Sequence, residues 1–417
     1  MLIGCIADDL TGATDLGVNL AREGLAVVQV NGVPPADFAV PAVDAVVVAL
    51  KSRTIPAAEA VAQSLAAHAW LRARGGERVY FKYCSTFDST PRGNIGPVTE
   101  ALAAAAGAGI VPATPAYPRN QRTVYRGHLF VGDLLLSDTG MREHPLTPMT
   151  DSNLVRVLGA QATRAVGLVA AETLDAGADA VRARLAALER DGCGHAIVDA
   201  TRDEHLTAAG AACVDCALTT GGAGLAIGLA RALRTQAGGG AGGYARPDAG
   251  TRVAWLSGSC SEATRRQVAH ALRTVPGLRL DPVVLAADPA AVAALARDAA
   301  AHAARGPVLV YATAAPAEVA AAQAALGRER AATVVEDAFR AIARALAGAG
   351  VRAFVVAGGE TSGAVVEALH VRALAIGPEI DPGVPWTRAV GGDPLWLALK
   401  SGNFGAEDFF AKATEAL

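Results

Sequence analysis

Two acidic residues, Asp8 and Asp9, stand side by side where a short apolar run gives way to a helical pattern. One of them, or Thr11, could cap the helix, but a cap explains one acidic residue better than two. A carboxylate here could also bind substrate hydroxyls, hold Mg²⁺ or act as a general base. We therefore take Asp9 as the first candidate for a catalytic residue, with Asp8 as an alternative.

Cations mixed with hydroxyls and amides follow the next two apolar runs of the chain. A third carboxylate, Asp88, lies among them and is a further candidate for the base. Arginine offers a planar fork to a carboxylate, whereas Ser and Asn can bind hydroxyls. Ligands bind at the carboxyl ends of parallel strands, so these loops predict one site for a small hydroxylated anion. Its candidate residues are Lys51, Ser52, Arg53, Lys82, Arg92, Gly93 and Asn94.

Two turns of small residues in the second half of the chain each join an apolar run to a helical pattern. Backbone N–H groups in such a turn can close on phosphate oxygens, and the helix N-terminus adds positive potential. Neither turn is followed by the Gly-Lys-Ser/Thr of a Walker A loop, and neither reads GxGxxG. Together they predict a nucleotide-phosphate site made of Ser257, Gly258, Ser259, Gly358, Gly359, Glu360, Thr361, Ser362 and Gly363.

A third loop, near the C-terminus, adds two candidates to the phosphate site. Lys400 could reach a phosphate, and Gly402 permits close approach of the backbone. A plain turn before the last helix is the alternative interpretation of this loop.

Short apolar runs that alternate with Ala- and Leu-rich helical segments must position these loops. This alternation predicts an α/β protein with two domains, each a mostly parallel sheet flanked by helices. Residues 13, 16, 17 and 20 share one helix face, and Gly24 ends that helix. The expected strands are 2–6, 45–50, 79–81, 109–111, 196–198, 253–256, 308–311 and 354–357.

A glycine-rich stretch, residues 236–250, marks the expected domain boundary. Glycine this dense supports neither helix nor strand, so the stretch predicts a flexible linker. We expect a substrate-binding domain over 1–235 and a nucleotide-binding domain over 251–417.

The composition excludes several classes of protein. The 417 residues carry a formal net charge of −3, which argues against a basic nucleic-acid footprint over the whole surface. No basic region or cleavage-like segment precedes Asp8, so we expect no signal peptide, and no stretch indicates a membrane span. The six scattered cysteines are typical of buried thiols in a reducing cytoplasm.

Taken together, the loops resemble the four-carbon acid sugar kinase family. The matching motifs run in the family's order along nearly the whole chain, and the middle stretch and LKSGNFG most resemble the 3-oxo-tetronate kinase branch. The motifs are ADDLTGA (7–13), LKSRT (50–54), KYCSTFDSTPRGNIGPV (82–98), the stretch from Tyr125 to Leu154, SGSCSEAT (257–264), GGETSGAVVEAL (358–369) and LKSGNFGAEDFF (399–410).

The resemblance implies ATP-dependent phosphorylation of the 4-hydroxyl of 3-oxo-tetronate. It places the sugar acid in the N-terminal domain and ATP in the C-terminal one. We expect the cations of the first three loops to hold the substrate carboxylate and the two small-residue turns to hold the ATP phosphates with Mg²⁺. Closure of the domains about the linker would exclude water.

Three alternative functions can be weighed against this one. The acceptor could be threonate or erythronate, since the same pocket chemistry serves each acid. An NAD-dependent oxidoreductase would need a GxGxxG turn with an acidic residue about twenty residues further on, and the sequence has neither. A non-catalytic sensor of sugar acids would need no phosphate loops. The sequence does not fix the metal ligands or the oligomeric state, and a homo-oligomer stays open.

Overall fold

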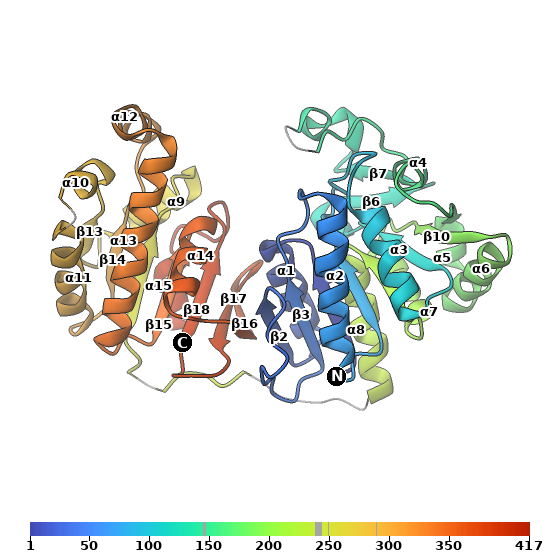
Figure 1. Ribbon diagram of the computed structural model, residues 1–417, viewed down its shortest axis with the longest axis horizontal. Coiled ribbons are helices and arrows are strands. Elements are labelled where there is room, and N and C mark those ends of the chain that lie inside the picture. Colours follow the sequence, from blue (N-terminus) through green and yellow to red (C-terminus); the bar gives the residue numbers. More distant parts are fainter. Residues whose placement is uncertain (145–146, 238–243, 249, 289) are drawn as a thin grey trace. The chain divides into compact units, whose positions relative to one another are not determined.

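A computed structural model describes residues 1–144, 147–237, 244–248, 250–288 and 290–417 (Figure 1). The chain forms two compact units, unit 1 (residues 1–243) and unit 2 (residues 244–417). Each unit is a sheet of mostly parallel strands with helices against it, so the predicted α/β class is confirmed. Among the described residues, no helix is long and apolar enough to cross a bilayer.

The main sheet of unit 1 is parallel at every described pairing. Its strands β1 and β3 are buried along their whole length, as strands covered by helices on both faces must be. In spatial order the strands are β2 (Val27–Asn31), β3 (Ala45–Ala49), β1 (Ile3–Ala7), β4 (Val79–Lys82), β11 (Leu218–Gly221), β5 (Val111–Thr114), β10 (Cys193–Val198) and β9 (Ala165–Val169).

The helices of unit 1 form two layers. The crossover from β1 to β2 runs toward one edge of the sheet, whereas β3 to β4 runs toward the other, so right-handed connections place α1 and α2 on opposite faces. Helices α1, α8, α7, α6 and α5 contact one another in series, and α2, α3 and α4 make the second series. Their bounds are α1 (Leu10–Arg22), α2 (Ala57–Arg72), α3 (Ile95–Ala106), α4 (Leu154–Gly159), α5 (Ala171–Asp175), α6 (Ala178–Arg190), α7 (Asp203–Cys213) and α8 (Ala223–Ala237).

A small antiparallel sheet lies between β5 and β9 in the sequence. It consists of β6 (Arg122–Tyr125), β7 (His128–Val131) and β8 (Leu134–Leu135), with short 3₁₀ turns before and after it. Asp199, at the end of β10, accepts hydrogen bonds from the N–H groups of Arg126, Gly127 and Ala171 and so ties this sheet to the main one.

Unit 2 has a mixed sheet. Strands β13, β14, β12, β15 and β18 are parallel neighbours, and β17 and β16 continue the sheet antiparallel. In spatial order they are β13 (Gly277–Arg279), β14 (Val308–Tyr311), β12 (Val253–Ser257), β15 (Ala353–Ala357), β18 (Trp396–Lys400), β17 (Val384–Ala389) and β16 (Ala373–Asp381).

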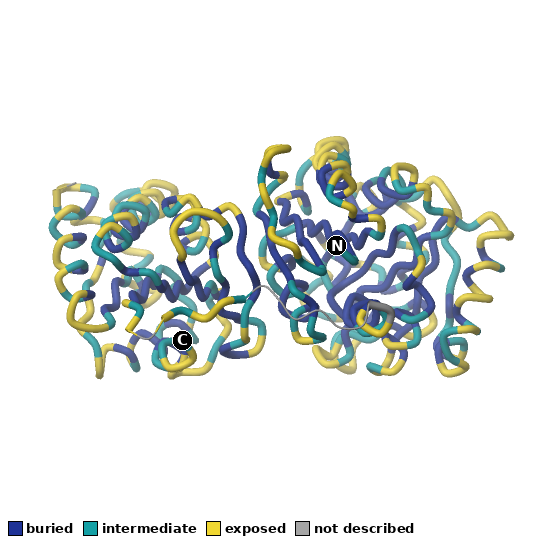
Figure 2. The backbone as a smooth tube through the Cα atoms, turned by 90° about the horizontal axis from the view of Figure 1, so that it is seen from below, coloured by how far each residue is buried: buried dark blue, intermediate teal, exposed yellow. Residues whose placement is uncertain are grey.

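Alternate residues of the unit 2 strands pack into two separate cores. Ala254 and Leu256 face a core built with α11, α13 and α14, whereas Val253 and Trp255 face a core built with α9 and α15. Figure 2 shows the strands as the buried interior of the unit. The helices are α9 (Glu262–Ala271), α10 (Pro282–Ala287), α11 (Ala290–Ala303), α12 (Pro316–Leu326), α13 (Arg328–Gly348), α14 (Gly359–Ala368) and α15 (Phe409–Glu415).

The predicted strands are all present, with one shift in position. The strand expected at 109–111 begins only at Val111 and continues through Pro112 to Thr114. The first helix is as predicted: Ala13, Leu16, Gly17 and Leu20 are buried, and Gly24 follows with φ +85°. The sequence reasoning missed β2, β9, β11, β13, the last three strands and the small sheet.

The segment between the two units is shorter than the predicted linker, residues 236–250. Helix α8 continues to Ala237, and Tyr244 and Ala245 already belong to unit 2. The Tyr244 ring packs against the core that includes Trp255, and Trp396 Nε1 donates to the carbonyl of Ala245 at 2.9 Å. Residues 238–243 and 249 of the predicted linker lie outside the described residues.

Helices α7 and α8 approach so closely that their glycines are required. A Cβ on Gly228 would lie 1.9 Å from the carbonyl oxygen of Leu206, and one on Gly210 would lie 2.0 Å from the carbonyl carbon of Gly228. These are backbone atoms, so the helices would have to separate to admit a methyl group.

We predict that Gly228→Ala destabilises unit 1 by about 1–3 kcal/mol, the usual cost of overpacking. Gly159→Ala is the matched control, because Gly159 is exposed and its added Cβ would meet nothing closer than 3.9 Å. Urea unfolding measures both. Equal stability of the two variants would contradict the close helix contact.

Candidate functional site

Arg53 is the centre of a charged cluster in unit 1. Its Nε and Nη2 donate to the two carboxylate oxygens of Asp8 at 3.0 and 2.8 Å, a bidentate pair. Its Nη2 also lies 2.8 Å from Asp9, and its Nη1 lies 4.0 Å from Asp88. Burial opposes the charged form of Arg53, but the hydrogen bonds to Asp8 and the charges of Asp8 and Asp9 outweigh it and raise the pKa of Arg53 above its usual value. The structure thus brings all three predicted base candidates around one guanidinium.

The sheet explains why these residues meet. Ala7, the last residue of β1, is in register with Ala49 of β3 on one side and Lys82 of β4 on the other. The connections after β1 and β4 leave toward opposite edges, so the gap between these two strands is the topological switch point, where open α/β sheets bind ligands.

Asp9 is both the N-cap of α1 and a member of the cluster. Its Oδ1 accepts from the N–H of Gly12 at 2.9 Å, while its side chain stays 30% exposed. A Cβ on Gly12 would lie 2.3 Å from that oxygen and 2.9 Å from Lys82 Nζ. The capping alternative considered for Asp9 is therefore correct, and it leaves Oδ2 without a hydrogen-bond partner among the described residues.

Lys82 is a buried cation at the end of β4. Its side chain is almost inaccessible, and its Nζ donates to the carbonyl of Tyr83 at 2.9 Å. No carboxylate of the described residues lies within ion-pairing distance of it.

The loop after β4 is held by aromatic packing and by one amide. Phe87, buried and edge-on to Tyr83, has φ +55°, a strained conformation for a bulky residue. Asn94 Nδ2 lies within hydrogen-bond distance of the carbonyls of Ser52, Arg53 and Ile55. Asn94 is thus occupied in binding the loop after β3, which positions Arg53.

The other predicted substrate residues have different surroundings. Ser52 is buried, and its N–H donates to the carbonyl of Asp8 at 2.9 Å. A Cβ on Gly93 would lie 1.9 Å from Ser89 Oγ, so this glycine is needed for packing. Lys51 and Arg92 are exposed and form no ion pair among the described residues, so the structure does not bring them into the Arg53 cluster.

In unit 2, the two small-residue turns also flank a switch point. Ser257 of β12 is in register with Ala357 of β15, and Ala357 with Lys400 of β18. The chain leaves β12 toward β13 and leaves β15 toward β16, in opposite directions. All three predicted phosphate loops therefore begin at one edge of the sheet.

Helix α14 begins with an uncapped N-terminus. Its N-cap Gly358 has φ +123° and no side chain caps the helix, so its first N–H groups lack intrahelical partners. A Cβ on Gly359 or Gly363 would meet nothing within 4 Å, and Glu360 is exposed. Ser362 Oγ is buried without a hydrogen-bond partner among the described residues. This open cradle of N–H groups suits an anion.

The turn after β12 fits against its neighbours. Ser257 Oγ pairs with Thr313 Oγ1 at 2.8 Å inside the fold. A Cβ on Gly258 would lie 2.1 Å from Thr361 Oγ1, and one on Gly402 would lie 2.3 Å from Ser259 Oγ. Ser257 and Thr361 therefore pack on the buried side of the turn, whereas Ser259 lies at its partly exposed tip.

Lys400 is buried below these loops. Its Nζ donates to Thr264 Oγ1 at 3.1 Å and to the carbonyls of Ser401 and Gly402 at 3.2 and 3.3 Å. Burial lowers the pKa of Lys400 to about 8. Thr264 and Ser261, which both donate to the carbonyl of Gly402, were missed by the sequence reasoning, although both lie in the quoted motif 257–264.

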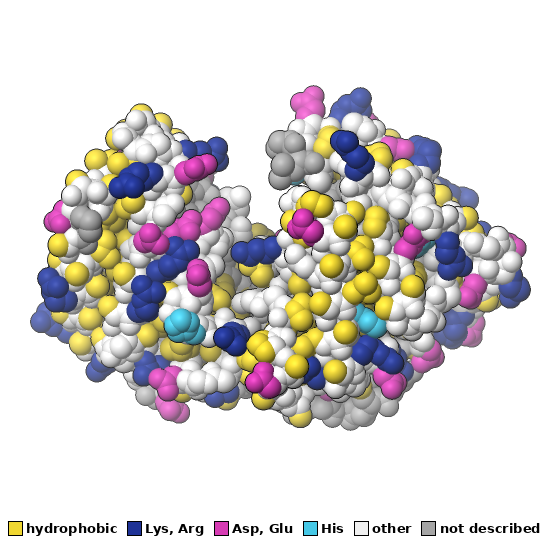
Figure 3. All heavy atoms as spheres, viewed as in Figure 1, with side chains coloured by type: hydrophobic (Ala, Val, Ile, Leu, Met, Phe, Trp, Pro, Cys, Tyr) yellow, Lys and Arg dark blue, Asp and Glu magenta, His cyan; other side chains and the backbone are white. Residues whose placement is uncertain are grey.

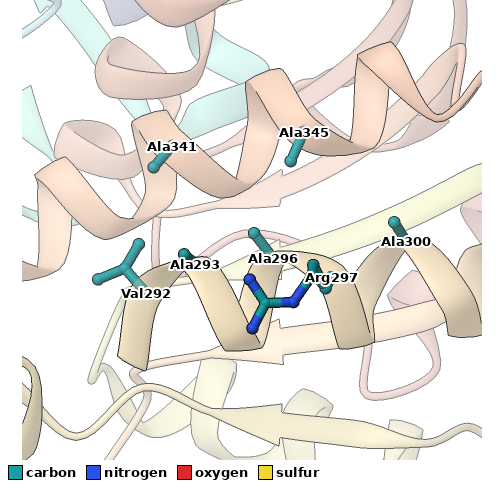
Figure 4. A pocket seen from close by; sticks show the side chains of 7 residues that line it. All are labelled: Val292, Ala293, Ala296, Arg297, Ala300, Ala341 and Ala345. Carbon is teal, nitrogen blue, oxygen red and sulfur yellow. The ribbon is translucent and has the colours of Figure 1, made fainter. Parts of the chain in front are cut away.

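A hollow of about 530 Å³ in unit 2 is unrelated to these loops. It lies between α11 and α13 and is lined by alanines, Val292 and Arg297 (Figure 4). Its lining offers one polar side chain, so it lacks the convergent polar groups of a substrate site. Among the described residues, no three acidic, His or Cys side chains converge as a metal site.

On the face seen in Figure 3, basic and acidic side chains are interspersed over each unit. That face carries no basic patch of the kind that binds nucleic acid.

Two family models match this chain, one within each unit. A family model described as a sugar-binding N-terminal domain matches residues 3–229, and one described as a nucleotide-binding C-terminal domain matches residues 254–410. A crystal structure from Salmonella typhimurium LT2, described provisionally as a tRNA synthase, has a TM-score of 0.93, is 45% identical and covers 100% of both chains.

Two curated 3-oxo-tetronate kinases are similar over their whole length. The one from Burkholderia multivorans is 55% identical and covers 100% of this chain and 97% of its own. The one from Pseudomonas fluorescens is 54% identical, with coverage of 99% and 96%. The chain therefore belongs to the four-carbon acid sugar kinase family, and within it resembles the 3-oxo-tetronate kinase branch.

Proposed function

We propose that this protein is an ATP-dependent kinase that transfers a phosphoryl group to the 4-hydroxyl of 3-oxo-tetronate, giving 3-oxo-tetronate 4-phosphate and ADP. The observation that carries the proposal is the pairing of two kinds of site in one chain. Unit 1 has a cluster of Arg53 and the buried Lys82 with carboxylates, which suits a hydroxylated acid, and unit 2 has an uncapped helix N-terminus, which suits phosphates. Relatives of the same length carry this activity in their names.

In unit 1, Lys82 and Arg53 would hold the acid and Asp9 would accept the proton of the attacking hydroxyl. Both oxygens of Asp8 are used by Arg53, which disfavours Asp8 as the base. Asp88 Oδ1 accepts from Thr86 at 2.5 Å, and its side chain is 12% exposed, so it is less accessible than Asp9. Lys51 and Arg92 are both exposed, so they would contact only the part of the bound acid that faces solvent.

In unit 2, the N–H groups at the start of α14 would bind the ATP phosphates. Gly359 leaves room for a phosphate, Ser362 Oγ offers an unused hydroxyl, and Ser259 lies on the opposite turn. Lys400 would add positive potential from below rather than a direct contact, because its Nζ already has three acceptors.

Mg²⁺ fits this arrangement as a partner of the phosphates. Mg²⁺ in kinases is held by one or two carboxylates, phosphate oxygens and water, so it needs no protein cage. Glu360, exposed in the first turn of α14, is a carboxylate placed to take part. Without a cation, its charge would repel a phosphate at the same helix end. Bound Mg²⁺ would neutralise charge on the transferred group.

One alternative, the tRNA synthase description of a structural neighbour, has weaker support. A curated Salmonella typhimurium protein, 45% identical over 414 residues, is named a 3-oxo-tetronate kinase, so the tRNA synthase description is not carried to this chain.

All described cysteines are free, which supports a reducing cytoplasm as the location.

One prediction concerns the sugar acid that accepts the phosphoryl group. With ATP and Mg²⁺, a coupled ADP assay on 3-oxo-tetronate, threonate and erythronate should give the highest kcat/KM with 3-oxo-tetronate. A higher value for threonate or erythronate would move the proposal to that acid, and no turnover with any of them would refute it.

Asp9→Asn is the variant that tests the base in the same assay. It should lower kcat at least about 100-fold, the usual contribution of a general base, while the acid still binds by calorimetry. An amide can still cap α1, so unfolding should change little. Near-normal kcat would exclude Asp9 as the base.

Another prediction concerns the phosphate cradle at the start of α14. Gly359→Val should raise the KM for ATP at least about tenfold, because the side chain would fill the space above the free N–H groups, with the KM for the acid unchanged. Gly306→Val, at an exposed glycine with equally open surroundings, should leave both constants unchanged. Equal behaviour of the two variants would place the phosphates elsewhere.

A further prediction follows from the lowered pKa of Lys400. At pH 8.5 the free protein holds Lys400 mostly neutral, since this pH is above its pKa of about 8. Phosphates nearby favour the ammonium, and a return to the ordinary value of Lys would take up about 0.7 of a proton. Calorimetry of ATP binding in two buffers of different ionisation enthalpy measures this uptake. Lys400→Met should abolish it, and uptake that persists in Lys400→Met would contradict the assignment.

A further inference from the structure

Helix α3 is not capped by its own N-cap residue. Asn94 holds the N-cap position, but its Nδ2 lies at three carbonyls of the loop after β3, and its side chain caps no N–H of the first turn. The N–H groups of a first turn have no acceptor within the helix, and Pro97 removes one of them. The N–H of Gly96 is therefore a donor that α3 itself cannot satisfy.

Gln161 supplies the missing acceptor from another part of the chain. Its Oε1 accepts from the N–H of Gly96 at 3.0 Å, and its Nε2 donates to Ser89 Oγ at 2.9 Å. A Cβ on Gly96 would lie 2.6 Å from the Cβ of Gln161 and 2.8 Å from its carbonyl oxygen, so a side chain at 96 would prevent this approach. One side-chain amide thus joins the start of α3 to the loop after β4.

Ser89 is buried, and two further contacts restrain it. Its N–H donates to Met149 Sδ at 3.4 Å, and the N–H of Met149 donates to the carbonyl of Met141 at 2.9 Å. Its Oγ fills the space beside Gly93, where an added Cβ would lie 1.9 Å away. Ser89 therefore has little freedom to move while Gln161 binds its hydroxyl.

Asp88, the residue before Ser89, belongs to the Arg53 cluster. Its Oδ1 accepts from the hydroxyl of Thr86, and its Oδ2 lies 4.0 Å from Arg53 Nη1. The Thr86 hydroxyl orients the carboxylate, whereas the backbone at Ser89 sets where that carboxylate lies. A shift of this backbone would move Asp88 away from Arg53.

The turn that carries Gln161 is anchored independently of the Gln161 amide. It follows α4, and the N–H groups of Thr163 and Arg164 both donate to the carboxylate of Glu100, at 2.6 and 3.1 Å. Glu100 lies about one turn further along α3 than Gly96. Loss of the Gln161 amide would therefore leave the turn in place and remove only its two hydrogen bonds.

We propose that Gln161 is a positioning residue for the sugar-acid site. By holding the loop after β4, it keeps Asp88 beside Arg53. Gln161 acts through this loop and does not touch the reacting atoms. The inference rests on the proposed function for the identity of the acid, but the hold of Gln161 on the loop does not depend on it.

The test compares Gln161→Leu, Gln161→Glu and the exposed control Gln63→Leu in the full-length protein. Leucine makes neither hydrogen bond, so Gln161→Leu should raise the KM for 3-oxo-tetronate at least about tenfold, with the KM for ATP within about twofold. Glutamate can accept from the Gly96 N–H and from the Ser89 hydroxyl, so Gln161→Glu should keep the KM for the acid within about threefold of the parent. Gln63→Leu should change neither constant.

General damage to unit 1 would not separate these variants. A KM for the acid in Gln161→Leu within about threefold of the parent, or a Gln161→Glu variant as impaired as Gln161→Leu, would overturn the inference. If Gln161→Leu does not fold, Ser89→Ala removes one of the two bonds with a smaller change in volume. It should then raise the KM for the acid and leave that for ATP unchanged, and an unchanged KM for the acid would overturn the inference.

If the parent protein phosphorylates no four-carbon acid, the proposed function fails and amide hydrogen exchange decides the hold on the loop. Peptides that cover residues 86–98 should then exchange at least about fivefold faster in Gln161→Leu than in the parent, and at the parent rate in Gln63→Leu. Unchanged exchange in Gln161→Leu would overturn the inference in that case.

Discussion

The ion pair between Arg53 and Asp8 is the interaction on which the rest of unit 1 depends. It joins the loop after β3 to the end of β1, and it is largely buried. Removing one partner of such a pair leaves the other charge desolvated, which typically costs about 3–5 kcal/mol. The surrounding structure serves this pair: Asn94 holds the backbone on both sides of Arg53, and Asp9 and Asp88 approach the same guanidinium.

Parallel sheet topology supplies the rest of the arrangement in both units. At a switch point two neighbouring strands send their chains apart, so the space beyond their ends is open to a ligand and lined by helix N-termini. Unit 1 fills that space with Arg53, Lys82 and carboxylates. Unit 2 leaves it lined with glycine and serine. The same fold thus yields a charged site in unit 1 and a site of small, uncharged residues in unit 2, according to the residues at the strand ends.

Much of this could be predicted from the sequence because it depends on local order. Strands such as 45–49 and 253–257 are apolar on both faces, and the polar loops follow them directly. Strands such as β9, which is only partly buried, and β11, whose Thr-Thr-Gly is polar, carry no such signal and were missed. The roles of Asn94 and Ser257 could not be predicted either, since hydrogen bonds to Ile55 and Thr313 come from residues distant in the sequence.

The close fit between the loop after β12 and the loop after β18 has a consequence for how the chain can change. Ser259 fills the space that any side chain at 402 would need, and the carbonyl of Gly402 accepts from both Ser261 and Thr264. These stretches lie about 140 positions apart in the chain, yet a side chain at 402 requires the Ser259 Oγ to move. In a mutational library they would vary as one segment, with tolerated changes at 402 appearing together with changes at 259.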